Sequence, residues 1–256
     1  WWSLPPRTAI PEATWQRRVY FAPFKALALN FGVRRATILL GPRRVGKTFM
    51  VKQLIHDAIQ DGFDPGAILY AAMDTPVYSG ISLERFLDFF PKSKVAERRL
   101  VVFDEIQYLA NWEVHLKTLV DNYPNTKFIA LGSAAAALKL KSAESGAGRF
   151  SDFMLPPLTF YEFLKFLEVE EELIDVKIKD EGRREYQARN IDELNKRFVD
   201  YLNFGGYPEA VLNPEIRENS EQFIRNDIID KVLLKDLPSL YGINDIQQLN
   251  KLFSFL

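Results

Sequence analysis

Residues 41–48 read GPRRVGKT and combine two glycines with a lysine and a hydroxyl side chain. They follow the apolar run ATILL (36–40), a predicted buried strand, and lead into TFMVKQLIHDAIQDG (48–62), a predicted helix that ends at Gly62. In this setting the spacing G-x-x-x-x-G-K-[ST] is typical of a loop that binds phosphate groups. A chance glycine-rich turn is the alternative, and the strand and helix on either side disfavour it.

The residue types in this loop indicate a role for most positions. Gly41 and Gly46 allow main-chain N–H groups to point at phosphate oxygens, and the start of the helix adds its positive end. Lys47 is expected to reach the β- and γ-phosphates of a nucleoside triphosphate, and the Thr48 hydroxyl to ligate Mg²⁺. The two arginines could contact phosphate or a neighbouring subunit, although solvated side chains are at least as common. The predicted nucleotide-binding residues are Gly41, Pro42, Arg43, Arg44, Val45, Gly46, Lys47, Thr48 and Phe49.

A pair of carboxylates ends the apolar stretch RLVVFDE (99–105), which predicts another buried strand. Ligands of open α/β sheets bind at the carboxyl ends of the strands, so Asp104 is expected to hold Mg²⁺ directly or through water. Glu105 would orient and deprotonate an attacking water molecule. The alternative is an acidic strand end that only caps the next segment, and the phosphate loop upstream disfavours it.

Two further side chains are candidates for the same site. Ser133 ends the predicted strand KFIALG (127–132) and could hydrogen-bond water or phosphate, or equally cap a helix in the alanine-rich segment that follows. Arg149 follows a Gly-Ala stretch and could neutralise charge in the transition state, within one chain or across subunits. An ordinary surface arginine is the alternative.

The composition narrows the class of protein. Nearly half of the 256 residues are apolar, which predicts a globular core, and the net charge of -1 gives no overall attraction for polyanions. There is no cysteine, which fits the cytoplasm and leaves no thiolate metal site, and the two histidines are expected to be structural or solvated. Apolar runs are too short to span a bilayer. Both ends of the sequence suggest that the natural protein is longer.

Short apolar runs alternate with helical patterns, which predicts an α/β fold with a parallel sheet. Thr159 and Glu162 have the spacing of a capping box, so a helix is expected after the fifth strand. The expected strands are 36–40, 67–73, 99–104, 127–132 and 150–158, and further helices are expected at 82–90 and 111–123. The expected domains are a phosphate-loop core with an N-terminal helical extension (1–168), a charged linker or insert (169–190) and a helical lid region (191–256).

The segments GPRRVGKT, LVVFDEIQYLANWE, SGAGRF, LPPLTFYEFL and FGGYPEAV together resemble a known group. The resemblance is to archaeal and bacterial AAA-type ATP-binding proteins, related to the STAND and archaeal ATPase groups, that carry a C-terminal domain of unknown function. It implies a P-loop NTPase sheet of the additional-strand type, in which the strand ending at Ser133 lies between the phosphate-loop strand and the acidic strand. It also implies a sensor role for Ser133, a role for Arg149 in the "GR" element, and a truncated winged-helix-like region near the end of the chain.

Mg²⁺-dependent ATP hydrolysis that drives a conformational change or a partner interaction is therefore the expected function. An ATP-dependent binding switch with negligible turnover is the main alternative. A small-molecule kinase is a further one, although the adjacent Asp104 and Glu105 favour water as acceptor. The expected partners are ATP and ADP, an unidentified protein and further copies of the chain. DNA stays open as a partner, but the C-terminal charges are mixed and form no basic stripe.

Overall fold

The computed structural model describes residues 10–78, 80–90, 98–133, 148–178, 184–238, 243 and 245–255. Two compact units can be distinguished by their internal contacts. The first comprises Trp1–Arg43, Lys47–Leu155 and Val232–Leu256, and the second comprises Arg44–Gly46 and Pro156–Lys231. The boundary after Leu155 falls earlier than the predicted end of the core at residue 168.

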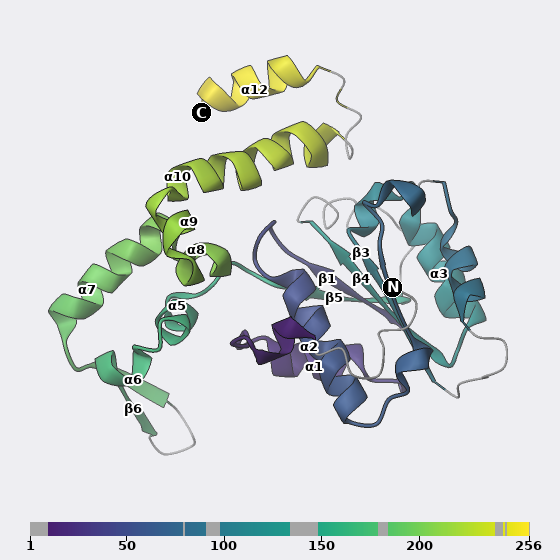
Figure 1. Cartoon of the computed structure of the whole chain (residues 1–256), viewed down its shortest axis with the longest axis horizontal. Helices are drawn as coiled ribbons and strands as arrows, with labels where there is room; N and C mark the ends of the chain where they lie inside the picture. Colours follow the sequence, from purple (N-terminus) through teal and green to yellow (C-terminus); the bar gives the residue numbers. More distant parts are fainter. Residues whose placement is uncertain are drawn as a thin grey trace. The chain divides into compact units, whose positions relative to one another are not determined.

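A five-stranded parallel sheet forms the centre of the first unit (Figure 1). The strand order is β2-β3-β4-β1-β5, so β4 separates β1 from β3 as the family resemblance implied. The predicted α/β class and the parallel five-stranded sheet are therefore confirmed. The strands are β1 (Ala36–Leu40), β2 (Ile68–Ala72), β3 (Arg99–Asp104), β4 (Thr126–Gly132) and β5 (Phe150–Met154).

Helices cover both faces of this sheet, with α1 and α2 on one face and α3 on the other (Figure 1). All of β1 is buried, as a strand covered on both sides requires. Gly62 has a φ of 93° and follows the end of α2, as predicted. The predicted helix at 82–90 is instead a 3-10 helix, and the Ser82 side chain makes no capping bond. The helices are η1 (Pro11–Thr14), α1 (Phe21–Ala28), α2 (Lys47–Gln60), η2 (Pro65–Ala67), η3 (Pro76–Tyr78), η4 (Leu83–Phe89), η5 (Ile106–Tyr108) and α3 (Trp112–Asn122).

The second unit is mainly helical. The predicted capping box is present, because Thr159 Oγ1 accepts from the N–H of Glu162 and the Glu162 carboxylate accepts from the N–H of Thr159. The charged stretch 169–190, expected as a linker or insert, includes a helical turn and two antiparallel strands, and its described residues are exposed or half-buried apart from Leu173. The elements are α5 (Phe160–Phe166), α6 (Glu170–Leu173), β6 (Ile174–Ile178), β7 (Arg184–Ala188), α7 (Ile191–Asp200), η8 (Tyr201–Gly205), α8 (Pro208–Leu212), α9 (Pro214–Glu218), α10 (Ser220–Phe223) and η9 (Ile224–Ile229).

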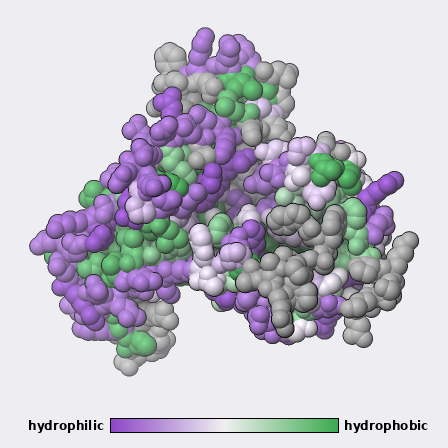
Figure 2. Space-filling view, viewed as in Figure 1, coloured by the Kyte–Doolittle hydropathy of each residue, from purple (hydrophilic) through white to green (hydrophobic). Residues whose placement is uncertain are grey.

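Two more helices, η10 (Val232–Asp236) and α12 (Ile246–Phe255), follow the second unit in the sequence and are grouped with the first. On the second unit, Figure 2 shows apolar areas within a mainly hydrophilic surface. The exposed large apolar side chains of α7 and η8 are Ile191, Phe198, Val199 and Leu202.

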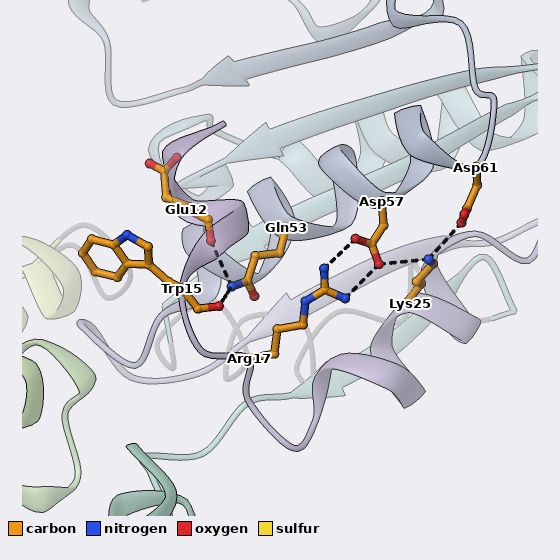
Figure 3. A network of polar contacts seen from close by, with 7 residues as sticks. All are labelled: Glu12, Trp15, Arg17, Lys25, Gln53, Asp57 and Asp61. Atoms are coloured by element: carbon orange, nitrogen blue, oxygen red, sulfur yellow. Dashed lines mark hydrogen bonds and ion pairs between the residues drawn. The ribbon is translucent and has the colours of Figure 1, made fainter. Parts of the chain in front are cut away.

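The segment before α1, and α1 through Lys25, are held against α2 by a polar network (Figure 3). Arg17 makes two hydrogen bonds to the Asp57 carboxylate, at 2.6 and 3.0 Å, and Lys25 Nζ lies 3.0 Å from Asp57 and 2.9 Å from Asp61. Burial alone would raise the pKa of Asp57, but the hydrogen bonds from Arg17 and Lys25 outweigh it and hold that pKa below its ordinary 3.8. The network therefore ties the N-terminal segment to the helix that begins in the phosphate loop.

Gln53 on α2 makes further contacts to the segment before α1 (Figure 3). Its Nε2 donates to the main-chain carbonyls of Glu12 and Trp15, each at 3.0 Å. Gln53 is buried, so both donor positions of its amide are used inside the protein. The N-terminal segment is thus held through its backbone as well as through its charges.

We predict that Asp57→Asn lowers the free energy of unfolding by about 1–2 kcal/mol, because Arg17 then loses its carboxylate partner and Lys25 keeps only Asp61. Asp61→Asn is the matched control, since Asp61 is 65% exposed, and should cost less than about 0.5 kcal/mol. Urea unfolding measures both. The folded-state pKa of Asp57 is lowered, so its stabilisation is complete above 3.8 and is lost as the pH falls through the lowered value. This account would be contradicted if the free energies of unfolding of wild type and Asp57→Asn differed by the same amount at pH 7 and at about pH 2.

Gly205 has a steric role in the core of the second unit. A Cβ at this position would lie 2.5 Å from Tyr201 Cδ2 and 2.9 Å from Phe163 Cδ2, both ring atoms in a packed aromatic cluster. At the neighbouring Gly206 the nearest atom would be Pro157 Cβ at 3.4 Å. Only the first glycine is therefore required by packing.

We predict that Gly205→Ala destabilises the protein by about 1–3 kcal/mol through overpacking, whereas Gly206→Ala stays within about 1 kcal/mol of wild type. Thermal unfolding of the two variants side by side measures the difference. Equal stability of the two variants would show that the aromatic side chains move to accommodate a methyl group at Gly205.

Candidate nucleotide-binding site

The phosphate loop connects the carboxyl end of β1 to the first residue of α2. Gly46 has a φ of 93° and Arg44 a φ of 63°, so two residues of this short turn have left-handed backbone. Alternation of backbone conformation of this kind directs successive N–H groups to one side, which makes a concave site for an anion. The side chain of Val45, between these two residues, is fully buried.

Lys47 lies folded over this turn. Its side chain is buried, and Nζ donates to the main-chain oxygens of Gly41 at 2.9 Å and Pro42 at 2.8 Å. A buried ammonium requires such acceptors, because isolated burial of its charge is costly. The amine therefore lies within the loop that is predicted to hold the phosphates.

The two predicted metal ligands are brought together. Thr48 Oγ1 donates to Asp104 Oδ2 at 2.8 Å, which joins the first turn of α2 to the end of β3. The N–H of Glu105 donates to Asp104 Oδ1 at 2.9 Å. A hydroxyl and a carboxylate are hard oxygen ligands of the kind that Mg²⁺ prefers, so this pair fits the ion. Among the residues that the structure describes, no group of three or more histidine, aspartate or glutamate side chains could hold a metal.

Glu105 lies directly beside this pair, in an unusual conformation. Its φ of 53° is left-handed, which is uncommon outside glycine and is often found at functional sites. Burial raises the pKa of Glu105, while the positive charges of Lys47 and Arg43 oppose that rise. The carboxylate thus lies close to the phosphate loop.

Gln107 connects Glu105 to the strand that ends at Ser133. Its Nε2 donates to Glu105 Oε2, and its Oε1 accepts from the N–H of Ser133 at 3.4 Å. The Ser133 side chain is buried at the end of β4, and its hydroxyl has no hydrogen-bond partner among the described residues. The alternative in which Ser133 caps a following helix falls on residues 134–140, outside the described residues.

Arg149 is the predicted site residue that lies elsewhere in the chain. It directly precedes β5, and its main-chain oxygen accepts from Ala36 N at 2.9 Å, at the amino end of β1. Its Nε lies 2.5 Å from Asp121 Oδ1 at the end of α3. Because the strands are parallel, this is the edge of the sheet opposite to the phosphate loop. Arg149 therefore does not join the loop of its own chain, and a role across subunits stays a prediction.

The two arginines of the loop have partners within the protein, whereas Phe49 is partly exposed. Arg43 Nη2 lies 3.5 Å from the Tyr108 hydroxyl. Arg44, which groups with the second unit, pairs with Glu209 at 2.8 Å. Phe49 is 38% exposed.

Two residues beside Asp104 and Glu105 were not among the sequence candidates. Tyr70 on β2 donates its hydroxyl to Asp104 Oδ2 at 2.5 Å, and Gln107 holds Glu105 as described above. Burial and the neighbouring Asp104 charge raise the pKa of Tyr70, so its hydroxyl acts as a donor. Tyr70 lies within an apolar run that reads only as a strand. Gln107 could have been proposed from the sequence, since it is a polar residue two positions after Glu105.

A parallel sheet with a phosphate loop after an interior strand, and a threonine–aspartate pair at the same edge, defines the class of P-loop nucleotide-binding proteins. A model of the AAA domain family matches residues 33–164, more than half of the chain, and the chain belongs to that family. A second model, for a domain of unknown function (DUF8612), matches residues 195–256. These matches agree with the sequence resemblance and support a nucleotide-binding function of the ATPase type.

Curated relatives match most of the chain. The uncharacterized proteins MJ1544 and MJ1637 of Methanocaldococcus jannaschii are 28% and 27% identical to it, over 86% of this chain and 45% and 47% of their own lengths. An uncharacterized protein of Haemophilus influenzae is 25% identical over 86% of this chain and 50% of its own. The chain spans about half the length of the curated relatives it matches.

Solved structures show weaker similarity. The Aeropyrum pernix ORC1 protein in complex with DNA matches with a TM-score of 0.45 and 15% identity, over 86% of this chain and 64% of that one. The Saccharomyces cerevisiae Hsp104–casein complex matches with a TM-score of 0.44 and 13% identity, over 64% of this chain and 31% of that one. The helices were also considered as possible membrane spans. No helix among the described residues has the length and apolarity that crossing a membrane requires.

From the expected role of Glu105 in activating water, we predict that Gln107→Glu lowers any ATP hydrolysis about tenfold or more while ATP affinity changes little. The variant keeps an acceptor for Ser133 N–H but replaces the donor to Glu105 by a repelling carboxylate. Phosphate release and equilibrium ATP binding, measured on the same preparation, separate the two effects. A parallel loss of binding would show that Gln107 supports the loop as a whole and not Glu105.

Proposed function

We propose that this protein is a Mg²⁺-dependent ATPase whose hydrolysis cycle drives a conformational change or a partner interaction. The observation that carries the proposal is the hydrogen bond between Thr48 and Asp104 beside a buried Lys47. It places a hydroxyl, a carboxylate and an ammonium at one edge of the sheet, next to a turn that can bind an anion. Together these groups suit a nucleoside triphosphate with its metal ion.

The residues of the loop would bind and orient the nucleotide. Main-chain N–H groups of residues 41–48 would donate to phosphate oxygens, and Lys47 would exchange the carbonyls of Gly41 and Pro42 for the β- and γ-phosphates. Thr48 and Asp104 would hold Mg²⁺, which supplies charge neutralisation between the phosphates when bound. We propose adenine as the base because the chain belongs to the AAA family, since the described loop residues are assigned contacts to phosphate groups and none to a base.

Glu105 is the proposed general base. Its carboxylate follows Asp104 at the strand end, where it would accept a proton from the water that attacks the γ-phosphate. The bond from Gln107 would keep that carboxylate in one orientation. Ser133, whose hydroxyl has no partner among the described residues, would contribute that hydroxyl to the same water or phosphate.

A nucleotide-dependent binding switch with slow turnover is the second candidate. It is favoured by the position of Arg149, because the described part of the chain brings no predicted arginine finger to the loop from within. An arginine worth several orders of magnitude in rate would then have to come from another copy or a partner. Homo-oligomerisation and an unidentified protein partner therefore belong to the proposal, as does action in the cytoplasm.

We predict that Glu105→Gln retains ATP binding while phosphate release falls by roughly 100-fold or more, because the general base is lost. Lys47→Ala should lose binding as well, since it removes the phosphate-binding ammonium. The measurement is phosphate release with each nucleoside triphosphate, with Mg²⁺ and with EDTA, alongside calorimetric binding.

Lys196→Ala serves as a control for the loss of one positive charge, because Lys196 has a 77% exposed side chain on α7 and is not among the predicted site residues, and it should keep both binding and turnover within a few-fold of wild type. Wild-type protein that binds ATP tightly but releases phosphate at the background rate would support the switch. Wild-type protein that binds no nucleoside triphosphate would refute both candidates.

A further inference from the structure

The side chain of Asp104 is surrounded by donors from three parts of the first unit. Its Oδ2 accepts from Thr48 Oγ1 at 2.8 Å and from the Tyr70 hydroxyl at 2.5 Å, and its Oδ1 accepts from Glu105 N at 2.9 Å. A carboxylate has about four lone-pair sites, two on each oxygen. Among the described residues, Oδ2 is therefore saturated, and Oδ1 keeps one site.

The sheet register explains how Tyr70 reaches this carboxylate. Ala72 pairs with Asp104 and Tyr70 pairs with Val102, so Tyr70 is a diagonal neighbour of Asp104 on the adjacent parallel strand. Ala71 belongs to the core on the face covered by α3, and alternation along the strand turns Tyr70 to the opposite face, where α2 begins. The contact follows from strand pairing and needs no loop to form.

Tyr70 is not needed to satisfy the carboxylate electrostatically. Thr48 and the N–H of Glu105 already donate to it, and phenylalanine would fill the same space on β2. What the hydroxyl adds is occupation of the second lone pair of Oδ2. The carboxylate can then offer a metal ion, or water on that ion, only Oδ1.

We propose that Tyr70 is a positioning residue that caps Oδ2 of Asp104, so that the carboxylate meets the metal through a single oxygen and selects Mg²⁺ over larger cations. This rests on the proposed function, since it presumes that Asp104 serves a metal–nucleotide complex. Mg²⁺ keeps several of its waters and demands strict geometry, whereas Ca²⁺ accepts bidentate carboxylates and higher coordination numbers. A carboxylate restricted to one oxygen suits the first ion better than the second.

The test is Tyr70→Phe, which removes the hydroxyl and keeps the ring. Binding of the non-hydrolysable analogue AMP-PNP is measured by calorimetry in EDTA and across a range of Mg²⁺ and of Ca²⁺ concentrations. In EDTA we expect wild-type affinity, because the phosphate loop is untouched. The Mg²⁺ concentration for half-maximal enhancement should rise about tenfold, as expected for the loss of one hydrogen bond to a charged group, and the value for Ca²⁺ should rise much less.

Tyr78→Phe is the matched control, because Tyr78 packs edge-on against Phe86 and no side-chain hydrogen bond of its hydroxyl is found among the described residues. Asp104→Asn is the reference for a lost metal ligand. An unchanged Mg²⁺ requirement in Tyr70→Phe, with the Mg²⁺ enhancement lost in Asp104→Asn, would overturn the role of Tyr70 and leave the proposed function standing. An equal rise for both metals would also overturn it, since general loosening does not discriminate between ions. Wild-type binding without any Mg²⁺ enhancement would instead defeat the proposed function.

Discussion

The hydrogen bond from Thr48 to Asp104 ties the start of α2 to the end of β3, although β4 separates β3 from the strand that precedes the loop. This contact exists because all the strands run in one direction, so that their carboxyl ends meet at one edge. The turn at residues 41–46, the carboxylate at 104 and the buried serine at 133 all depend on that common direction. The same geometry sends Arg149 to the far edge, where β5 begins.

Much of the site could be predicted because its signals are local. A glycine, lysine and threonine at fixed spacing specify a backbone turn, and an acidic residue after four apolar ones specifies a strand end. The capping box at Thr159 and the stop at Gly62 depend on chemistry within a few residues, and both are present in the structure. The parallel sheet followed from strands that are apolar on both faces.

Features that depend on contacts between distant residues were beyond the sequence. Tyr70 reaches Asp104 only through the register of two strands, which no short pattern encodes. Arg149 looked suitable because glycine and alanine precede it, but its strand begins at the wrong edge of the sheet. The antiparallel strands β6 and β7 were not predicted within the expected linker or insert, because their charged residues hide the weak alternation of apolar and polar positions and two short strands carry little apolar signal. The 3-10 geometry of residues 83–89 is likewise set by packing of Leu83 and Phe86 in the core.

The position of β2 at the margin of the sheet has a consequence for the native-state energy landscape. In the described sheet β2 pairs on one side only, with β3, and outer strands tend to open in local fluctuations that cost less than global unfolding. Each such opening would withdraw the tyrosine hydroxyl from Asp104 while the interior strands stay paired. The carboxylate that we propose to hold the metal is thus linked to an outer strand, so hydrogen exchange at Ile68–Ala72 and metal binding at Asp104 should change together.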